Sequence, residues 1–218
     1  VLTIAAIDAG KKARASSGKG VVSDIRKGFA YAAGNPTLLG LIIMAFIPVL
    51  FGMSYYVLLP AWAREALDVK ADALGLLMMT MGVGALIGSL AVAGLRGIQR
   101  RGLLLLASCI AWGIALSLFS LTTSYALALP LLLFVGLASS VFMTLNFTLL
   151  QTYASAEMRG RIMSIAMMTF GVMPLSALPF GAMAEHVGTP NALFLSGLLL
   201  AIFTIVFAIA YPHFRKIA

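Results

Sequence analysis

The sequence predicts an all-α integral membrane protein, a bundle of six transmembrane helices. Hydrophobic residues make up 61% of the 218-residue chain and charged residues only 10%, whereas soluble proteins carry about 25% charged residues. The apolar residues gather in six runs of 19 to 23 residues, and none of these runs contains Asp, Glu, Lys, Arg or His. Because about 20 apolar residues cross a bilayer as a helix, every run is long enough to span.

Two shorter segments precede the first run. Residues 1–7 are apolar but too short to span, and their basic residues follow the apolar stretch, unlike those of a signal peptide. We expect them to be the tail of a preceding transmembrane helix, and residues 8–34, with six Lys and Arg, to be a cytoplasmic linker. Ile25, Phe29, Ala32 and Ala33 share one face of a helix. This pattern indicates either an amphipathic helix at the headgroups or a solvated linker helix without membrane contact.

Residues 35–218 are expected to form the six-helix bundle. The runs cover residues 38–59, 73–95, 103–121, 125–147, 162–183 and 192–211. The third and sixth consist almost wholly of Leu, Ile, Ala and Phe, which predicts a peripheral position with much lipid contact. The single cysteine, Cys109, lies in an apolar run, so the sequence predicts a packing role for it and no disulfide or metal site.

The basic residues predict the orientation. If the chain alternates across the membrane, 13 of the 15 Lys and Arg lie on one side, and only Arg64 and Lys70 lie on the other. The positive-inside rule assigns the rich side to the cytoplasm, so both termini are expected there. The net charge of +8 thus sits in connections and one N-terminal segment, a distribution that argues against nucleic-acid binding. The first three spans run opposite to the last three, the 3+3 inverted layout of half a secondary transporter.

Polar residues in the spans mark candidate positions for a substrate cavity. In the fourth span, Gly136, Ser140, Thr144 and Thr148 form a stripe, which indicates either close helix packing or the wall of a wet cavity. Tyr residues near the outer end of the first span are either interfacial anchors or substrate contacts, and clustered methionines suit either varied apolar ligands or core filling. The candidates are Tyr55, Tyr56, Met79, Ser140, Phe142, Thr144 and Asn146. Of these, Asn146 in particular needs a polar partner inside hydrocarbon.

Glycine and proline residues mark sites of packing or bending. Gly84 and Gly88 form a GxxxG pair in the second span, which predicts close helix packing. The fifth span holds residues that weaken backbone hydrogen bonds, namely Gly171, Pro174, Pro179 and Gly181. These residues predict either a flexible helix that gates a pathway or a static kink.

Two basic corners resemble those of a known family. The first reads Gly88-Ser89-Leu90-Ala91 and continues to Arg96, Arg100, Arg101 and Gly102, and the second runs from Leu150-Gln151 through Glu157 and Arg159-Gly160-Arg161 to Ser164. The first resembles a degenerate copy of the loop motif G-x-L-a-D-r-x-G-r-r of the major facilitator superfamily, with Val92 in the place of the motif's Asp. The second resembles the corner between the fourth and fifth helices of the C-terminal half in exporters of the enterobactin and macrolide efflux type.

The resemblance implies half of a 12-helix transporter that works by alternating access. Its cavity would be lined by the first, second, fourth and fifth spans, and the N-terminal six-helix half of the same protein would be its partner. The substrate would be a small lipophilic molecule such as a drug or a siderophore, with no cofactor. Coupling to protons would need a carboxylate in the other half, because a charge at a helix centre costs about 2.5–3.5 kcal/mol and these spans hold none.

The charged corners also supply candidates for a cytoplasmic gate in the inner membrane. These candidates are Arg96, Arg100, Arg101, Gln151, Glu157, Arg159 and Arg161. They would close the gate through ion pairs and contacts with helix ends; the alternative is that these charges only hold the topology.

Two rival classes remain at this stage. A six-span intramembrane serine protease would pair a buried Ser with a His, but Ser139 lies about 21 Å from the outer end of its span, where His186 is placed. An enzyme is therefore disfavoured. A stand-alone half-size carrier or structural subunit that dimerises is the second alternative.

Overall fold

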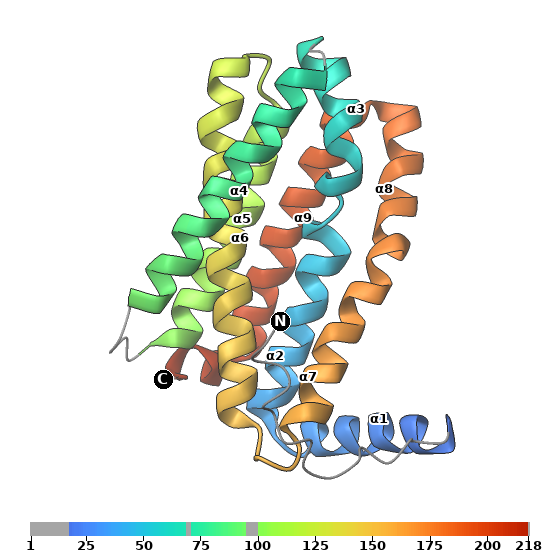
Figure 1. Ribbon diagram of the computed structural model, residues 1–218, viewed down its shortest axis with the longest axis vertical. Coiled ribbons are helices and arrows are strands. Elements are labelled where there is room, and N and C mark those ends of the chain that lie inside the picture. The colour runs from blue at the N-terminus through green and yellow to red at the C-terminus, as the bar shows by residue number, and fades with distance from the viewer. Residues whose placement is uncertain (1–17, 69–70, 95–99, 218) are drawn as a thin grey trace, which may run out of the picture.

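Helices form every regular element in the described part of the chain, which comprises residues 18–68, 71–94 and 100–217 of the computed structural model (Figure 1). Six helical stretches are long and apolar enough to cross a membrane. They are Pro36–Leu67, Asp72–Gly94, Arg101–Ser120, Tyr125–Tyr153, Arg159–Val187 and Thr189–Ala210. The predicted all-α membrane bundle is therefore confirmed.

Two of the six spans are interrupted near their middle. The first consists of α2 (Pro36–Ile47), the π-helical η2 (Pro48–Gly52) and α3 (Tyr55–Leu67). The fifth consists of α7 (Arg159–Met168), the 3₁₀-helical η3 (Thr169–Val172) and α8 (Met173–Val187). The others are the continuous helices α4 (Ala71–Gly94), α5 (Arg101–Ser120), α6 (Tyr125–Tyr153) and α9 (Thr189–Ala210). A surface helix, α1 (Gly18–Ala33), precedes them, and a short 3₁₀ helix, η4 (Pro212–Lys216), follows.

Local sequence signals explain where several helices begin and end. Asn35 Oδ1 accepts hydrogen bonds from Thr37 N and Leu38 N at 3.0 and 3.3 Å, which caps α2. Asp68 ends α3 in the left-handed conformation, with φ of 49°. Gly188, with φ of 87°, makes the tight turn between α8 and α9. Beside this turn, Glu65 Oε2 accepts a hydrogen bond from Thr189 N at 2.9 Å and so ties the end of α3 to the start of α9.

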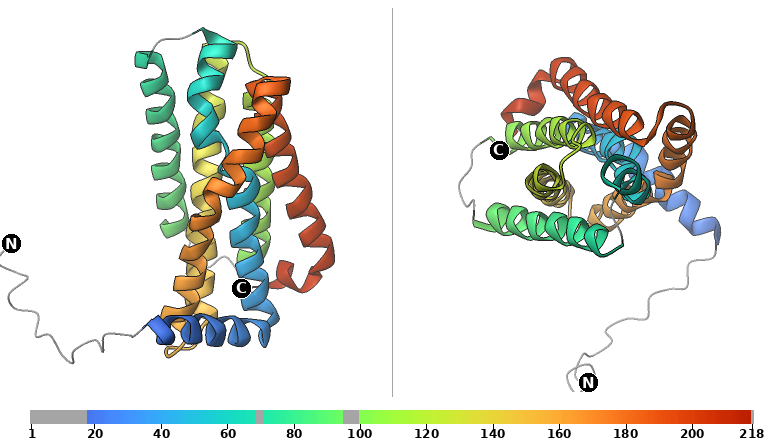
Figure 2. Two further views of the ribbon diagram at one scale, coloured as in Figure 1. Left: turned by 90° about the vertical axis from the view of Figure 1, so that its right-hand side faces the viewer. Right: turned by 90° about the horizontal axis from the view of Figure 1, so that it is seen from above.

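The spans divide between two sides of the bundle. The first span, α4, α6 and the fifth span share the face that is toward the viewer in Figure 1, and α5 and α9 lie behind them. The view from above shows the same division, with α9 and α4 on opposite sides (Figure 2). Helix α1 lies across the end at which α2 and α7 begin. We call this the basic end, because it also carries Arg100, Arg101 and the C-terminal segment.

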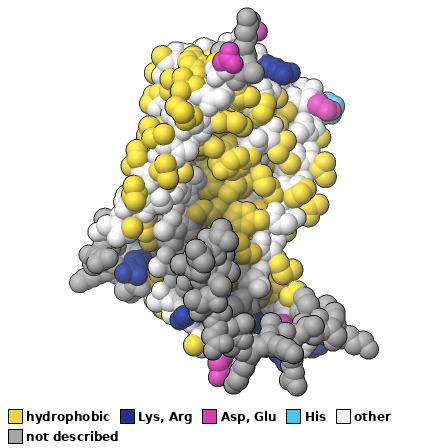
Figure 3. All heavy atoms as spheres, in the orientation of Figure 1, with side chains coloured by type: hydrophobic (Ala, Val, Ile, Leu, Met, Phe, Trp, Pro, Cys, Tyr) yellow, Lys and Arg dark blue, Asp and Glu magenta, His cyan; other side chains and the backbone are white. Residues whose placement is uncertain are grey.

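Charged residues gather at the two ends of the bundle, and its flank is apolar (Figure 3). Arg64, Glu65 and Asp68 close α3 at one end, where Glu185 and His186 also close α8. Arg159 and Arg161 begin α7 at the basic end. The structure thus separates the two groups of connections that the sequence separates by charge.

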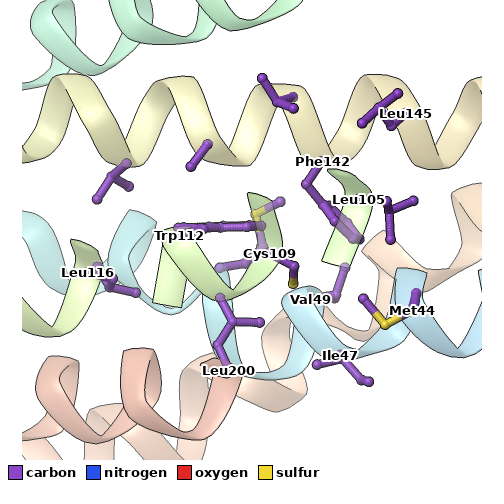
Figure 4. Close-up of a cluster of buried hydrophobic side chains, with 14 of the residues drawn as sticks. Met44, Ile47, Val49, Leu105, Cys109, Trp112, Leu116, Phe142, Leu145 and Leu200 are labelled. Carbon is purple, nitrogen blue, oxygen red and sulfur yellow. The ribbon is translucent and has the colours of Figure 1, made fainter. Parts of the chain in front are cut away.

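The core is built around α5. In the most apolar 18-residue stretch of α5, 61% of the residues are buried inside the bundle. In the corresponding stretch of α4, only 17% are buried. Trp112, Phe142 and Leu200 approach one another from α5, α6 and α9, and Val49 of η2 lies beside them (Figure 4). This burial corrects the prediction that the third span has much lipid contact: an all-apolar helix composition does not distinguish protein neighbours from lipid.

Glycines let α4 and α6 approach closely. A Cβ on Gly84 would collide with Leu133 O, and one on Gly88 would lie 2.5 Å from Leu137 O. A Cβ on Gly136 would in turn collide with Met81 O of α4. Since backbone carbonyls cannot yield as flexible side chains do, this interface requires glycine at all three positions.

Candidate functional site

An aromatic cluster links three spans in the middle of the bundle. Tyr55 and Tyr56 stack with ring centroids 4.4 Å apart, and Tyr55 meets Trp112 edge-on at 6.4 Å. Trp112 in turn lies 6.3 Å from Phe142 of α6. Tyr55 and Phe142 are fully buried, whereas 44% of Tyr56 is exposed. Of the predicted cavity residues, the structure therefore brings Tyr55, Tyr56 and Phe142 into one cluster, and only Tyr56 reaches the surface.

Trp112 joins this cluster, although the sequence analysis did not select it. Its Nε1 is the one buried side-chain nitrogen or oxygen that lacks a hydrogen-bond partner within the described residues. Trp62, by contrast, donates its Nε1 hydrogen to Ser120 O at 3.0 Å. A signal was present, because Trp112 lies mid-span, far from the interfaces where Trp is usually found. The Nε1 hydrogen of Trp112 is therefore an unsatisfied donor among mostly apolar side chains.

Asn146 fastens the fourth span to the first. Its Nδ2 donates to Leu41 O at 3.1 Å, which supplies the partner that a buried amide requires. A small cavity of about 10 Å³ lies next to it, lined in part by Thr169 and Phe170 of η3. That volume is about the size needed for one water molecule. In this conformation Asn146 serves helix contact and does not face a substrate-sized space.

The polar stripe of α6 has different surroundings along its length. Gly136 lies in the contact with α4, while Ser140 and Thr144 are half-buried. Thr148, at the far end, is exposed and donates its hydroxyl to Thr144 O at 2.7 Å. Close packing therefore explains one end of the stripe, and the other end remains available to line a path.

Met79 lies apart from the aromatic cluster. It is 61% exposed on α4, among other exposed apolar side chains of that helix. Those are Leu76, Met78, Val83, Leu86, Ile87 and Leu90. We call this set the α4 face.

The predicted hinge residues of the fifth span surround its interruption. Gly171 lies within η3, and Pro174 falls in the first turn of α8. A Cβ on Gly171 or Gly181 would have nothing within 4 Å, so a side chain at either position would meet no neighbour. Pro179 lies inside α8.

Two gate candidates at the basic end, Arg159 and Arg161, contact the end of α6 and the surface helix α1. Arg161 Nη2 forms an ion pair with Asp24 Oδ1 of α1 at 2.9 Å. Arg159 Nε donates to Gln151 O at 3.0 Å. Nearby, Tyr31 Oη accepts a hydrogen bond from Ser155 N at 3.2 Å, and the hydrogen bonds from Ser155 lower the pKa of Tyr31 below its usual value of 10.0. The corner between α6 and α7 is thus bound to α1 by two polar contacts, at Asp24 and Tyr31.

The remaining gate candidates are not part of this group. Glu157 is exposed, and Arg100 and Arg101 begin α5 on the other side of the basic end. Arg96 lies outside the described residues. Within the described residues, the ion pair made by a gate candidate joins Arg161 to Asp24 of α1.

No group of three or more His, Cys, Asp or Glu in the described ranges is placed to hold a metal ion. Cys109 is buried and lies 3.3 Å from Thr204 Oγ1 of α9. The chemistry of the described residues is therefore that of helix contacts, apolar surfaces and charged ends.

A bundle of six candidate spans with a shared face of four spans and a basic end has the architecture of a membrane transport protein. The chain belongs to the transmembrane secretion effector family of the major facilitator superfamily, whose profile matches residues 1–216. It is similar to the enterobactin exporter EntS of Shigella flexneri, with 29% identity over 195 residues. That match covers 87% of this chain and 45% of the relative. The enterobactin exporter EntS of Escherichia coli O9:H4 strain HS is 28% identical over 195 residues, which cover 46% of it. The chain thus spans about half the length of the curated relatives it matches.

Proposed function

We propose that the chain is one half of a proton-coupled exporter that moves small lipophilic molecules, such as siderophores or drugs, out of the cell by alternating access. The observation that carries this proposal is the shared face of the first span, α4, α6 and the fifth span, in a chain similar to enterobactin exporters over 87% of its length. Exposed Tyr56 and Met79, together with Thr144, would line the path along this face.

The partner of this face would be the N-terminal six-helix half of the same protein. The α4 face supports this proposal, because only 17% of the most apolar 18-residue stretch of α4 is buried against other helices of this chain. The relatives are about twice as long as the matched region, which leaves room for a second half. The predicted helix tail, residues 1–7, and the first part of the predicted linker, residues 8–17, lie outside the described residues.

The basic end would face the cytoplasm of a multi-pass inner-membrane protein. The excess of Lys and Arg in its connections supports this orientation. The α6–α7 corner would then form the cytoplasmic gate, held closed by Arg161 on Asp24 and Arg159 on Gln151 O. Movement of the fifth span about η3 would break these contacts when the gate opens.

Transport by the full-length protein in proteoliposomes provides the test. Uptake of a labelled catecholate siderophore into inside-out vesicles should require an imposed proton gradient and stop with an uncoupler. Uptake that ignores the gradient would contradict proton coupling, and no uptake of any lipophilic substrate tested would contradict the exporter proposal. Replacing Arg159 and Arg161 with Ala should slow uptake without preventing membrane insertion; unchanged rates would remove their gating role.

A half-size carrier that dimerises is the alternative. Expression of this chain alone, without the other half, separates the two proposals. Uptake by vesicles that contain only this chain would favour the dimeric carrier, and uptake that depends on co-expression of the other half would favour the exporter described above.

A further inference from the structure

Helices α5 and α9 are in direct contact over much of their length. A Cβ on Gly113 would lie 2.6 Å from Gly197 O, so both glycines are needed for this approach. Ser117 Oγ donates to Phe194 O at 3.1 Å, and Cys109 Sγ lies 3.3 Å from Thr204 Oγ1. Small residues and short polar contacts thus hold the two backbones together.

At the basic end the C-terminal segment enters between the two helices. Gly102 N donates to Ile217 O at 3.1 Å, and a side chain on Gly102 would collide with Phe214 O. Phe214 and Ile217 are both buried. The inserted segment therefore separates the first turns of α5 from the last turns of α9.

This separation leaves a groove of about 310 Å³ on the outer surface of the bundle. It is lined by Leu103, Ala107 and Ile110 of α5, Ile205 and Ile209 of α9, and Arg215. The side chains of Leu103 and Ile209 are 43% and 66% exposed, so the groove is open to the surroundings of the bundle. One wall belongs to α9, which lies on the side of the bundle away from α4 in the view from above (Figure 2).

The guanidinium of Arg215 lies at the basic end of this apolar groove. Arg215 donates from Nε and Nη2 to Ala208 O, at 3.0 and 2.8 Å, which fixes its guanidinium beside the last turn of α9. Arg215 has no carboxylate within ion-pair distance in the described part of the chain. Arg100 and Arg101 start α5 at the same end. The groove therefore offers an apolar wall along the membrane and a fixed positive charge at headgroup level.

We propose that this groove binds an anionic phospholipid from the leaflet at the basic end. The phosphate would meet Arg215, and part of one acyl chain would lie between α5 and α9. The helix from Leu103 to Ile110 rises about 10 Å, so the wall is long enough for a segment of an acyl chain. Charge complementarity favours an anionic headgroup, because juxtamembrane Lys and Arg attract acidic lipids. The proposal depends on membrane insertion and not on what the protein transports.

The test counts the lipids that remain bound to the purified full-length protein. The protein is extracted from bilayers of phosphatidylethanolamine and phosphatidylglycerol mixed three to one, and retained lipids are counted by native mass spectrometry. Arg215→Gln should lower the preference for phosphatidylglycerol about fivefold, the factor expected for one cation at a membrane surface. Arg215→Lys keeps the charge and should retain the preference.

A second variant tests the groove without touching the charge. Ala107→Trp should fill the groove and remove the retained phosphatidylglycerol, whereas Leu118→Trp, on the exposed side of α5 but outside the groove, should leave it bound. An unchanged preference in Arg215→Gln, or retained lipid in Ala107→Trp, would overturn the proposal. Binding of inorganic phosphate to the delipidated protein, with the same dependence on Arg215, would assign the site to a free anion and would also overturn it.

Discussion

The first and fifth spans are both interrupted near mid-membrane, but their surroundings differ. In the first span, 61% of the most apolar window is buried, compared with 28% in the fifth. A Cβ on Gly52, at the end of η2, would lie 3.0 Å from the Trp112 ring and from Leu200. A Cβ on Gly171, within η3, would meet nothing within 4 Å.

The interruption η2 is therefore closely packed at Gly52, whereas η3 is open at Gly171. A π-helical turn or a 3₁₀ turn is a departure from ideal geometry, and either one is frequent at functional sites. Whether it can move depends on how many neighbours must move with it. We therefore expect η2 to hold its shape as part of the core, and η3 to change shape at low cost.

Removal of the Trp112 side chain should have the largest effect on the first span. Trp112→Ala should lower the free energy of unfolding by about 3–5 kcal/mol, because it leaves a cavity against η2 and α6. Trp112→Phe should cost only about 1 kcal/mol, since the lost indole N–H has no partner within the described residues. Denaturant unfolding of the full-length protein in detergent would measure both changes in the free energy of unfolding. Equal losses for the two variants would mean that the ring does not support η2.

Substitution of valine for Gly52 and for Gly171 compares how tightly η2 and η3 are packed. Gly52→Val should lower the free energy of unfolding by about 1–3 kcal/mol, because its side chain has no room between Trp112 and Leu200. Gly171→Val should change it by about 0.5 kcal/mol or less, because that position is open. Thermal unfolding of the two variants, measured in parallel, provides the comparison. A larger loss for Gly171→Val would contradict the assignment of the rigid and mobile interruptions.

The sequence predicted the spans well because length and apolar composition are local properties. It also predicted that Gly171, Pro174, Pro179 and Gly181 weaken the helix of the fifth span. The interruption η3 contains Gly171 and ends just before Pro174, whereas α8 continues through Pro179 and Gly181. The π-helical turn was less accessible, since Pro48 and Gly52 do not reveal whether the chain inserts an extra residue or simply bends. Burial was the hardest property to predict: α4 and α5 are equally apolar, yet only α5 is surrounded by other helices.

The candidate site followed the same pattern. The requirement of Asn146 for a partner could be deduced from chemistry alone, and its partner is Leu41 O. The role of Trp112 depends on three spans meeting, which no local pattern encodes. The Asp24–Arg161 ion pair joins residues more than 130 positions apart. Sequence reasoning named Arg161 as a gate residue but could not name its partner on α1.

Stiffening η3 should affect transport more than stability. Ala is favoured over Gly in a helix by about 0.5–1 kcal/mol, so Gly171→Ala should shift the balance between bent and straight forms about two- to fivefold. We expect transport in proteoliposomes to slow by a similar factor, with no loss of thermal stability. Gly75→Ala is the matched control, because Gly75 is also open but lies in the uninterrupted α4. Equal slowing by both variants would indicate a general effect of helix propensity.

Loss of the Asp24–Arg161 ion pair should have only a small effect on stability. Both side chains are partly exposed, at 47% and 37%, so Asp24→Asn should cost at most about 1 kcal/mol. High salt should reduce this difference further by screening. If the pair keeps α7 docked on α1 while the gate is closed, Asp24→Asn should increase the fraction of molecules in which α7 has moved away from α1. The distance between spin labels on α1 and α7 measures this fraction. The exchange Asp24→Arg with Arg161→Asp should restore the docked distance, because the attraction does not depend on which helix carries the positive charge. A distance that is lost in Asp24→Asn and restored in the exchange would attribute docking to the charges, whereas a distance that Asp24→Asn leaves unchanged would attribute it to the close fit of Gly28 against Ile165.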